Sequence, residues 1–165
     1  MNILRPLPLL ITVLILGTIA YFILRSGPED QIRAKLNELA ETVSTPAANT
    51  DGLLGKAKII ASFQDLLANP VALDTQYSAA QGIRSPKELA AAYLSLLQSG
   101  QSVTLEFNSP SITFPHENES KVETKVKASL SRNQQPIRTE SGTLYITLGK
   151  DPNGDWKFER FSQHP

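Results

Sequence analysis

The sequence predicts an α+β fold in which three helices pack on a curved, cone-like antiparallel sheet, preceded by one transmembrane helix. Three observations support this class. Between residues 28 and 100, apolar residues recur at spacings of three and four, which is the spacing of one helix face. From residue 102 onward, apolar and polar residues alternate, as they do in strands with one covered face. An uncharged apolar run precedes both regions.

The composition restricts the class of function. The chain has 165 residues, which suits one ordinary domain with a short appendage. Its 16 basic and 16 acidic side chains give a formal net charge of zero, so no long-range field attracts nucleic acid. Cysteine is absent, which excludes disulfides, thiol catalysis and thiolate metal sites. We expect no nucleic-acid partner, no cofactor and no metal.

Residues 6–24, between Arg5 and Arg25, form an uncharged apolar segment of about the length that spans a bilayer as a helix. The alternative is a cleaved signal peptide. Such peptides have shorter apolar regions, and Thr18-Ile19-Ala20 is a poor cleavage site. The segment therefore predicts a single-pass membrane protein, with residues 1–27 as tail and anchor and residues 28–165 as the α+β domain.

Two orientations of the anchor are considered. Arg25, Arg33 and Lys35 follow the segment while only Arg5 precedes it, and this count places the domain in the cytoplasm. A short tail is nevertheless easily retained in the cytoplasm, because long domains are translocated largely regardless of their charge. We expect the domain to be extracytoplasmic, in the periplasm of a bacterium.

Three helices are predicted after the anchor. The first begins at Pro28 with acidic residues in its first turn, where they face the positive end of the helix dipole. The second covers about Gly52–Ala68 and ends before Asn69-Pro70, since the residue before a proline disfavours helix. The apolar stripe of the first helix consists of Ile32, Leu36, Leu39 and Val43.

The third helix has the clearest start. Ser85 at the N-cap, Pro86 at the first position and Glu88 at the third form a capping box, and Gly100 provides a left-handed end. Between the second and third helices, residues 71–77 are interpreted as a short edge strand.

Four further strands are predicted at residues 102–114, 121–132, 136–150 and 156–163. The second alternates most regularly, so that one face is wet and the other requires a cover. The only candidates for that cover are the stripes of the three helices. The alternating residues of that strand are Val122, Thr124, Val126, Ala128 and Leu130 on one face and Lys121, Glu123, Lys125 and Lys127 on the other.

Two passages carry a resemblance to a known family: QGIRSPKELAAAYLSLLQSGQSVTLEF (81–107) and NGDWKFERFS (153–162). Both are similar to passages of the nuclear transport factor 2-like (SnoaL-like) superfamily, a capped helix leading into a strand and the terminal strand. The resemblance implies that helices and sheet enclose a conical pocket from about Pro28 to the end of the chain. That scaffold serves enzymes, ligand carriers, a dimerising transport factor and secretion-system subunits, so it implies no single activity.

Catalytic members of that family place a Tyr, Asp or His in the pocket. Tyr93 lies on the apolar stripe of the third helix, and Asp65 and Asp74 have apolar neighbours. We take these three as candidate ligand-binding residues and predict no catalytic residue. Each has a structural alternative: Tyr93 as a core residue, Asp65 on the polar side of the second helix and Asp74 as a residue that fixes a turn.

The predicted function is that of a membrane-anchored, non-catalytic binding or scaffolding domain. It would present the cone or a sheet face to a protein partner or a small apolar ligand, and a second copy of the chain could pair through the sheet face. Two alternatives stay open. One is a lyase- or isomerase-like enzyme that uses the cone pocket, and the other is an inner-membrane scaffold subunit of a secretion system.

Overall fold

The computed structural model describes residues 27–44, 52–75 and 81–163. The predicted anchor, residues 6–24, lies outside the described residues. Within the described ranges, no helix combines the length and the apolar character needed to cross a membrane. The chain divides into two compact units, Met1–Gln31 and Ile32–Pro165, and the second contains the sheet. The domain boundary that we placed at residue 28 stays a prediction.

The three predicted helices are confirmed as α2 (Pro28–Val43), α3 (Leu53–Leu66) and α4 (Pro86–Gln98). The predicted stripe of α2 is buried at Ile32, Leu36 and Leu39. The capping box of α4 is also confirmed. The Glu88 amide donates to Ser85 Oγ over 3.2 Å, and the Ser85 amide donates to Glu88 Oε2 over 2.7 Å.

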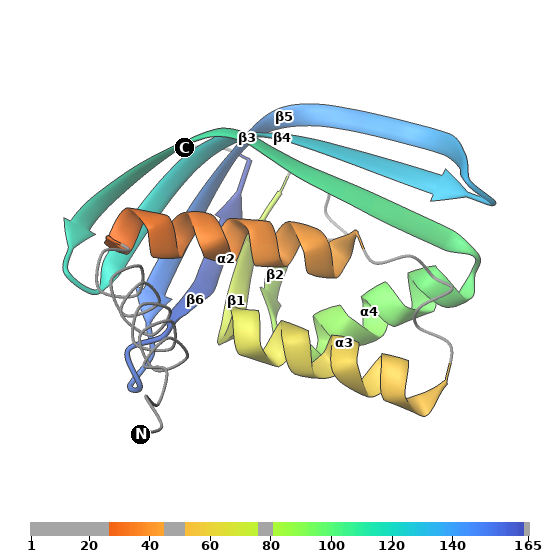
Figure 1. The fold of residues 1–165 in the computed structure, drawn as a ribbon, viewed down its shortest axis with the longest axis horizontal. Coiled ribbons are helices and arrows are strands. Elements are labelled where there is room, and N and C mark those ends of the chain that lie inside the picture. The colour runs from red at the N-terminus through yellow and green to blue at the C-terminus, as the bar shows by residue number, and fades with distance from the viewer. Residues whose placement is uncertain (1–26, 45–51, 76–80, 164–165) are drawn as a thin grey trace, which may run out of the picture. The chain divides into compact units, whose positions relative to one another are not determined.

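The sheet has six strands in the order β2-β1-β6-β5-β4-β3 (Figure 1). The four predicted strands of the second half are confirmed as an antiparallel meander, β3 to β6. The bounds are β1 (Leu67–Asp74), β2 (Gly82–Arg84), β3 (Gln101–His116), β4 (Glu119–Arg132), β5 (Gln135–Lys150) and β6 (Trp156–Ser162).

The first strand corrects three predictions. The second helix ends at Leu66 and not at Ala68, and Asn69-Pro70, a cis peptide, lies inside β1 and does not end the helix. The predicted edge strand is an interior strand, because β1 pairs with β2 on one side and with β6 on the other. The β1–β6 pairing is parallel, so the sheet is mixed where we predicted an antiparallel one. A strand led directly out of α3 satisfies the backbone groups on the free side of β6.

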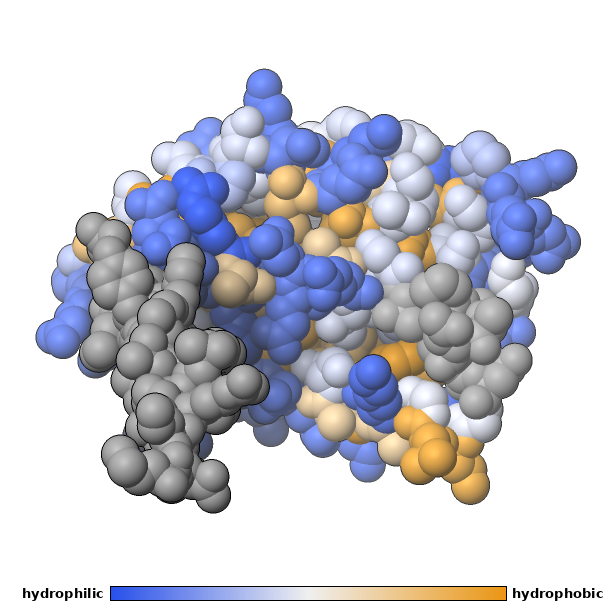
Figure 2. Space-filling model, viewed as in Figure 1, coloured by the Kyte–Doolittle hydropathy of each residue, from blue (hydrophilic) through white to orange (hydrophobic). Residues whose placement is uncertain are grey.

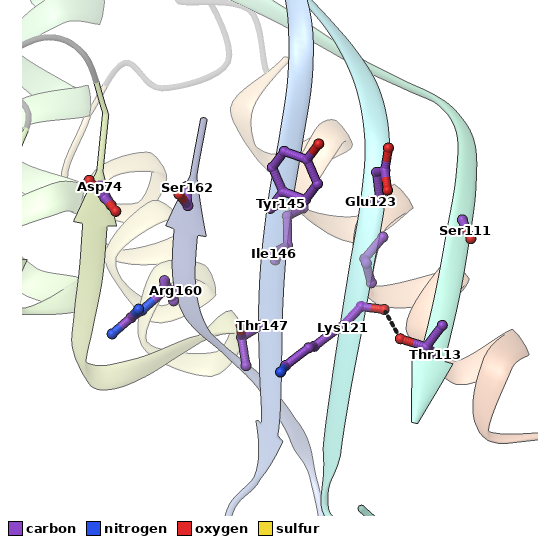
Figure 3. A pocket seen from close by; sticks show the side chains of 11 residues that line it. Asp74, Ser111, Thr113, Lys121, Glu123, Tyr145, Ile146, Thr147, Arg160 and Ser162 are labelled. Carbon is purple, nitrogen blue, oxygen red and sulfur yellow. Dashed lines mark hydrogen bonds between the residues drawn. The ribbon is translucent and has the colours of Figure 1, made fainter. Parts of the chain in front are cut away.

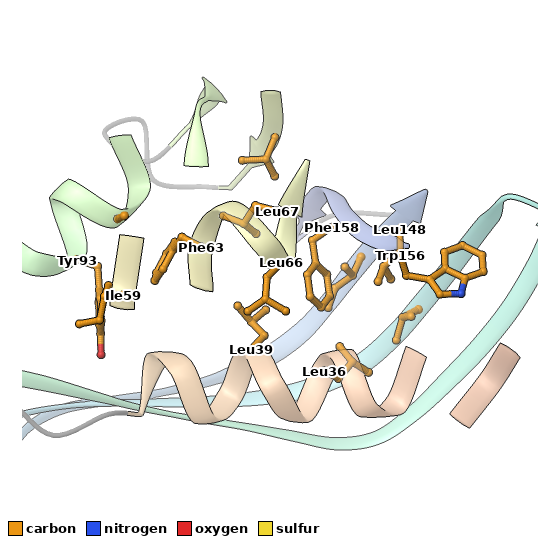
Figure 4. Packing of buried hydrophobic residues seen from close by; sticks show 14 of the residues in the cluster. Leu36, Leu39, Ile59, Phe63, Leu66, Leu67, Tyr93, Leu148, Trp156 and Phe158 are labelled. Carbon is orange, nitrogen blue, oxygen red and sulfur yellow. The ribbon is translucent and has the colours of Figure 1, made fainter. Parts of the chain in front are cut away.

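The helices cover one face of this sheet, and the core lies between the two layers (Figure 4). The predicted alternation in β4 is confirmed: Val122 and Thr124 are 2% and 1% exposed, while Lys121, Glu123 and Lys125 are exposed. The largest fully buried side chains are Phe158, Ile32, Leu36, Leu66, Ile146 and Leu148. The core therefore joins α2, α3 and the middle strands.

A β-bulge at Glu159 interrupts β6. Leu148 pairs with Phe158 and Thr147 with Arg160, so Glu159 has no partner opposite it. A bulged residue shifts the alternation of side chains by one position. As a result Phe158 and Phe161 both face the core, where their rings stack with centroids 5.5 Å apart.

The surface is mainly polar on the side seen in Figure 2, with a hydrophobic group of atoms where α3 begins. Leu53 and Leu54, the first two residues of α3, are 87% and 89% exposed. Neither leucine contributes to the core.

Candidate functional site

A groove of about 410 Å³ lies on the face of the sheet opposite the helices, which we call the outer face (Figure 3). Five strands contribute to it. Two of its members, Val122 and Ile146, have side chains buried in the core. The lining consists of Asp74, Ser111, Thr113, Lys121, Val122, Glu123, Tyr145, Ile146, Thr147, Arg160 and Ser162.

The strand register arranges the polar lining in two rows that cross the strands. In the first row, Tyr145 of β5 pairs with Glu123 of β4 on one side and with Ser162 of β6 on the other. Ser162 in turn pairs with Asp74 of β1. Directly paired residues point to the same face of a sheet, so this row carries one aromatic ring between two carboxylates.

The second row lies two residues further along β5. Thr147 pairs with Lys121 of β4 and with Arg160 of β6, so that a hydroxyl lies between two cationic side chains. Thr113 of β3 completes the row opposite Lys121, and its hydroxyl donates to the Lys121 carbonyl over 3.4 Å. One row is therefore acidic and the next is basic.

The charges of the groove are largely uncompensated by ion pairs. In the part of the chain that the structure describes, no ion pair involves Asp74, Glu123 or Arg160. The ammonium of Lys121 lies 3.5 Å from a carboxylate oxygen of Glu119, in a pair that is itself exposed. Exposed ion pairs contribute little to stability, so these side chains are available to a ligand.

Tyr93, the first predicted site residue, is a core residue and lies outside the groove. Its side chain is 9% exposed, and its ring lies 5.6 Å from that of Phe63. The hydroxyl donates to the carbonyl oxygen of Val43 over 2.7 Å. Burial raises the pKa of the Tyr93 phenol above its ordinary value. The structure therefore agrees with the alternative interpretation of Tyr93 as a core residue.

Asp65, the second predicted site residue, lies on the exposed side of α3. Its side chain is 79% exposed and lies 3.7 Å from the ammonium of Lys157, which also donates to the Asp65 carbonyl. It lines a separate shallow hollow together with Glu38 of α2. Tyr93, Asp65 and Asp74 therefore do not form one site.

Asp74 is the one predicted site residue that lines the groove. The groove also contains residues that were not predicted as site residues: Tyr145, Arg160, Glu123 and Lys121. The alternation in residues 143–148 could have placed Tyr145 and Thr147 on the polar face. The position of Arg160 depends on the bulge at Glu159, which no local pattern indicates. Among the described residues, no group of three His, Asp or Glu side chains could hold a metal ion.

Comparison with known proteins identifies the fold. No protein-family model and no curated protein matches the sequence. Solved structures do match. A nuclear transport factor 2-like superfamily protein from Salmonella enterica serovar Typhimurium LT2 is 16% identical, with 79% of this chain and 85% of that chain covered and a TM-score of 0.58.

Two further structures agree with it. A protein of unknown function from Shewanella oneidensis MR-1, described as like nuclear transport factor 2, is 17% identical, with 82% of this chain and 98% of that chain covered and a TM-score of 0.55. A similar protein from Rhodospirillum rubrum, described as of unknown function in nutrient uptake, is 12% identical, with 81% and 98% covered and a TM-score of 0.56. The predicted resemblance is confirmed at the level of the fold.

Proposed function

Taking the nuclear transport factor 2-like fold as the premise, we propose that this chain is a non-catalytic binding domain that binds a small polar ligand on the outer face of its sheet. The groove there is the observation that carries the proposal. Its volume of about 410 Å³ is in the range of small-molecule sites. Its hydroxyl, acidic and basic side chains favour a polar ligand over the small apolar one expected from the sequence.

The arrangement on the other face of the sheet favours binding over catalysis. General acid–base catalysis needs a proton donor or acceptor within reach of the substrate. The hydroxyl of Tyr93 is already bonded to the Val43 carbonyl, and Asp65 and Asp74 lie on other surfaces. The predicted residues Tyr93, Asp65 and Asp74 therefore do not form the catalytic group that the alternative, a cone-pocket enzyme, requires.

The proposal includes the membrane anchor. Residues 6–24 would hold the domain at the membrane, on its extracytoplasmic side, so that the groove samples ligands there. We also propose that a protein partner, including a second copy of the chain, can bind to the same face of the sheet. The secretion-system scaffold stays a prediction that no described contact bears on.

The binding function is tested with the full-length protein in lipid nanodiscs. Polar metabolites are screened by thermal unfolding, since a ligand that binds only the folded state raises the midpoint. We expect hits that are lost in Arg160→Gln but kept in Tyr93→Phe and in Lys127→Gln, a matched change on the exposed side of β4. The ligand should be recovered unaltered by mass spectrometry. If the ligands depend on Tyr93, or if they are recovered chemically altered, the binding proposal is wrong and the cone-pocket enzyme takes its place.

The anchor is tested separately. We expect the protein to remain with membranes after carbonate extraction and to keep its N-terminus. Because the chain lacks cysteine, Lys87→Cys on the exposed side of α4 creates a single thiol. A membrane-impermeant maleimide added to intact spheroplasts should label it if the domain is extracytoplasmic. Labelling only after lysis would place the domain in the cytoplasm.

A further inference from the structure

We propose that the ligand of the outer-face groove is a zwitterion, with its oxyanion on the basic row and its ammonium on the acidic row. This inference rests on the proposed function, because it concerns the same groove. It adds the chemical class of the ligand and the direction in which the ligand lies along β5.

The oxyanion end is defined by Thr147 and its two neighbours. Neighbouring strands lie about 4.8 Å apart, so the backbones of Lys121 and Arg160 are each one strand spacing from Thr147. Figure 3 shows the side chain of Lys121 directed toward Thr147. A hydroxyl flanked by an ammonium and a guanidinium is a donor set that suits a carboxylate or a phosphate.

The ammonium end is defined by Tyr145 and the carboxylates of its row. Glu123 lies directly opposite Tyr145 on β4, and Asp74 lies two strands away on the other side, beyond Ser162. An ammonium over an aromatic ring is attracted by the electrons of the ring face, and two carboxylates add charge attraction. Both carboxylates lack ion-pair partners among the described residues, so no ion pair has to be broken when an ammonium binds there.

The spacing of the two ends selects among ligands. Tyr145 and Thr147 are two residues apart on one strand, which corresponds to about 7 Å. The groove holds two acidic and two basic side chains, so a ligand with one charge meets as much repulsion as attraction. A zwitterion with separated charges meets attraction at both ends. The oxyanion must compete with Glu119 for Lys121. Because the groove is open to solvent, we expect millimolar affinity.

A set of matched probes tests this inference by nuclear magnetic resonance titration of the full-length protein in nanodiscs. The zwitterion is 5-aminopentanoate, whose charges are separated by a chain of four methylenes. Its singly charged counterparts are pentanoate and pentylammonium, and glycine carries both charges close together. We expect 5-aminopentanoate to shift the amide signals of Tyr145 and Thr147 and to bind about fivefold or more tightly than each of the other three.

The variants assign the two ends. In Arg160→Gln the affinity for 5-aminopentanoate should fall to that of pentylammonium, and in Glu123→Gln it should fall to that of pentanoate. Lys127→Gln, on the exposed side of β4 beyond the groove, should leave the affinity unchanged. If pentanoate or pentylammonium binds as tightly as the zwitterion, the inference is wrong while the proposed function stands. If neither these probes nor the polar-metabolite screen gives a ligand that depends on the groove, both are wrong.

Discussion

The hydroxyl of Tyr93 donates a hydrogen bond of 2.7 Å to the backbone carbonyl of Val43, fifty residues earlier in the chain. Val43 is the last residue of α2, Tyr93 lies in α4, and the Tyr93 ring also contacts Phe63 of α3. A single side chain thus links α2, α3 and α4. The last carbonyl groups of a helix have no partner within the helix, and this hydroxyl supplies one.

Tyr93→Phe should lower the free energy of unfolding by about 1 kcal/mol, because one hydrogen bond is lost while the ring is kept. Ligand binding to the groove should be unchanged, since Tyr93 lies in the core. Urea unfolding and ligand titration of the same preparation measure both quantities. Loss of ligand binding in a fully folded variant would contradict the structural role of Tyr93.

The same tyrosine predicts a pH dependence at the alkaline end. Burial raises the pKa of the Tyr93 phenol in the folded state, while the unfolded chain titrates near the ordinary value of about 10. Above that pH the unfolded chain binds fewer protons than the folded one, so the free energy of unfolding falls as the pH rises toward the folded pKa.

The contribution of the Tyr93 phenol to the free energy of unfolding is fully present below the unfolded pKa, and it is absent from Tyr93→Phe. Because the chain has four tyrosines, the informative quantity is the difference between the two proteins. We expect the wild-type protein to lose more stability than the variant between neutral pH and strongly alkaline pH. Parallel stability curves for the two proteins would show that the phenol titrates alike in both states.

Ser85→Ala should destabilise the protein by about 0.5–2 kcal/mol, because the amide of Glu88 loses its hydrogen-bond acceptor at the start of α4. Ser95→Ala, at an exposed position in the last turn of the same helix, is the matched control and should be neutral or slightly stabilising. Chemical unfolding of both variants measures the difference. If Ser85→Ala and Ser95→Ala are equally stable, the capping box does not contribute to the stability of the protein.

The capping box also changes the titration of Glu88. Hydrogen bonds from the backbone amide and the hydroxyl of Ser85 hold the pKa of the Glu88 carboxyl below its ordinary value. Because the pKa of Glu88 is lower in the folded state than in the unfolded chain, its ionisation adds to the free energy of unfolding above the unfolded pKa. This contribution is lost as the pH falls through the folded pKa. In Ser85→Ala the pKa of Glu88 should therefore rise, as carboxyl chemical shifts would report.

Gly100→Ala should destabilise by about 1–2 kcal/mol, because Gly100 follows the end of α4 with a φ of 74°. Gly142→Ala is the control. No φ in the left-handed range is found at Gly142, and apart from Gly142 and its two chain neighbours no heavy atom lies within 4 Å of the position that its Cβ would take. We expect the control to be as stable as the wild type in thermal unfolding. An unchanged midpoint for Gly100→Ala would mean that the helix ends differently in solution.

Two leucines of α3 provide a test of the core. Leu66 is fully buried, so Leu66→Ala should cost about 2–5 kcal/mol. Leu54 is 89% exposed in the same helix, so Leu54→Ala should change stability by less than about 0.5 kcal/mol. Comparable losses in the two variants, measured by urea unfolding, would indicate that Leu54 is covered in solution.

The features that could be predicted from the sequence are those encoded by neighbouring residues. The capping box of Ser85 and Glu88 spans four residues, and the alternation around Val122 spans one strand. Both were correct because a local hydrogen bond and a single face determine them. The parallel pairing of Leu73 with Phe161 joins segments far apart in the chain, and no pattern within either segment indicates it.

The groove illustrates the same division. The outward position of Lys121 and Glu123 follows from the alternation in β4, but a site also requires Asp74 and Arg160 from two other strands. Their place beside Tyr145 and Thr147 depends on the strand order and on the bulge at Glu159. The sequence therefore predicted a polar face. The groove depends on the register of five strands, which brings the side chains of that face together.

The parallel pairing of β1 with β6 has a consequence for biosynthesis. During translation, α3, β1 and α4 emerge well before β6, so the long neighbour of β1 is missing until residues 156–162 have been synthesised. Pairings between distant segments form late and leave apolar surface open in the meantime. A nascent chain would thus keep apolar surface open until β6 has been synthesised, and if it is exported, until β6 has crossed the membrane. Holding chaperones on that route have this interval in which to act.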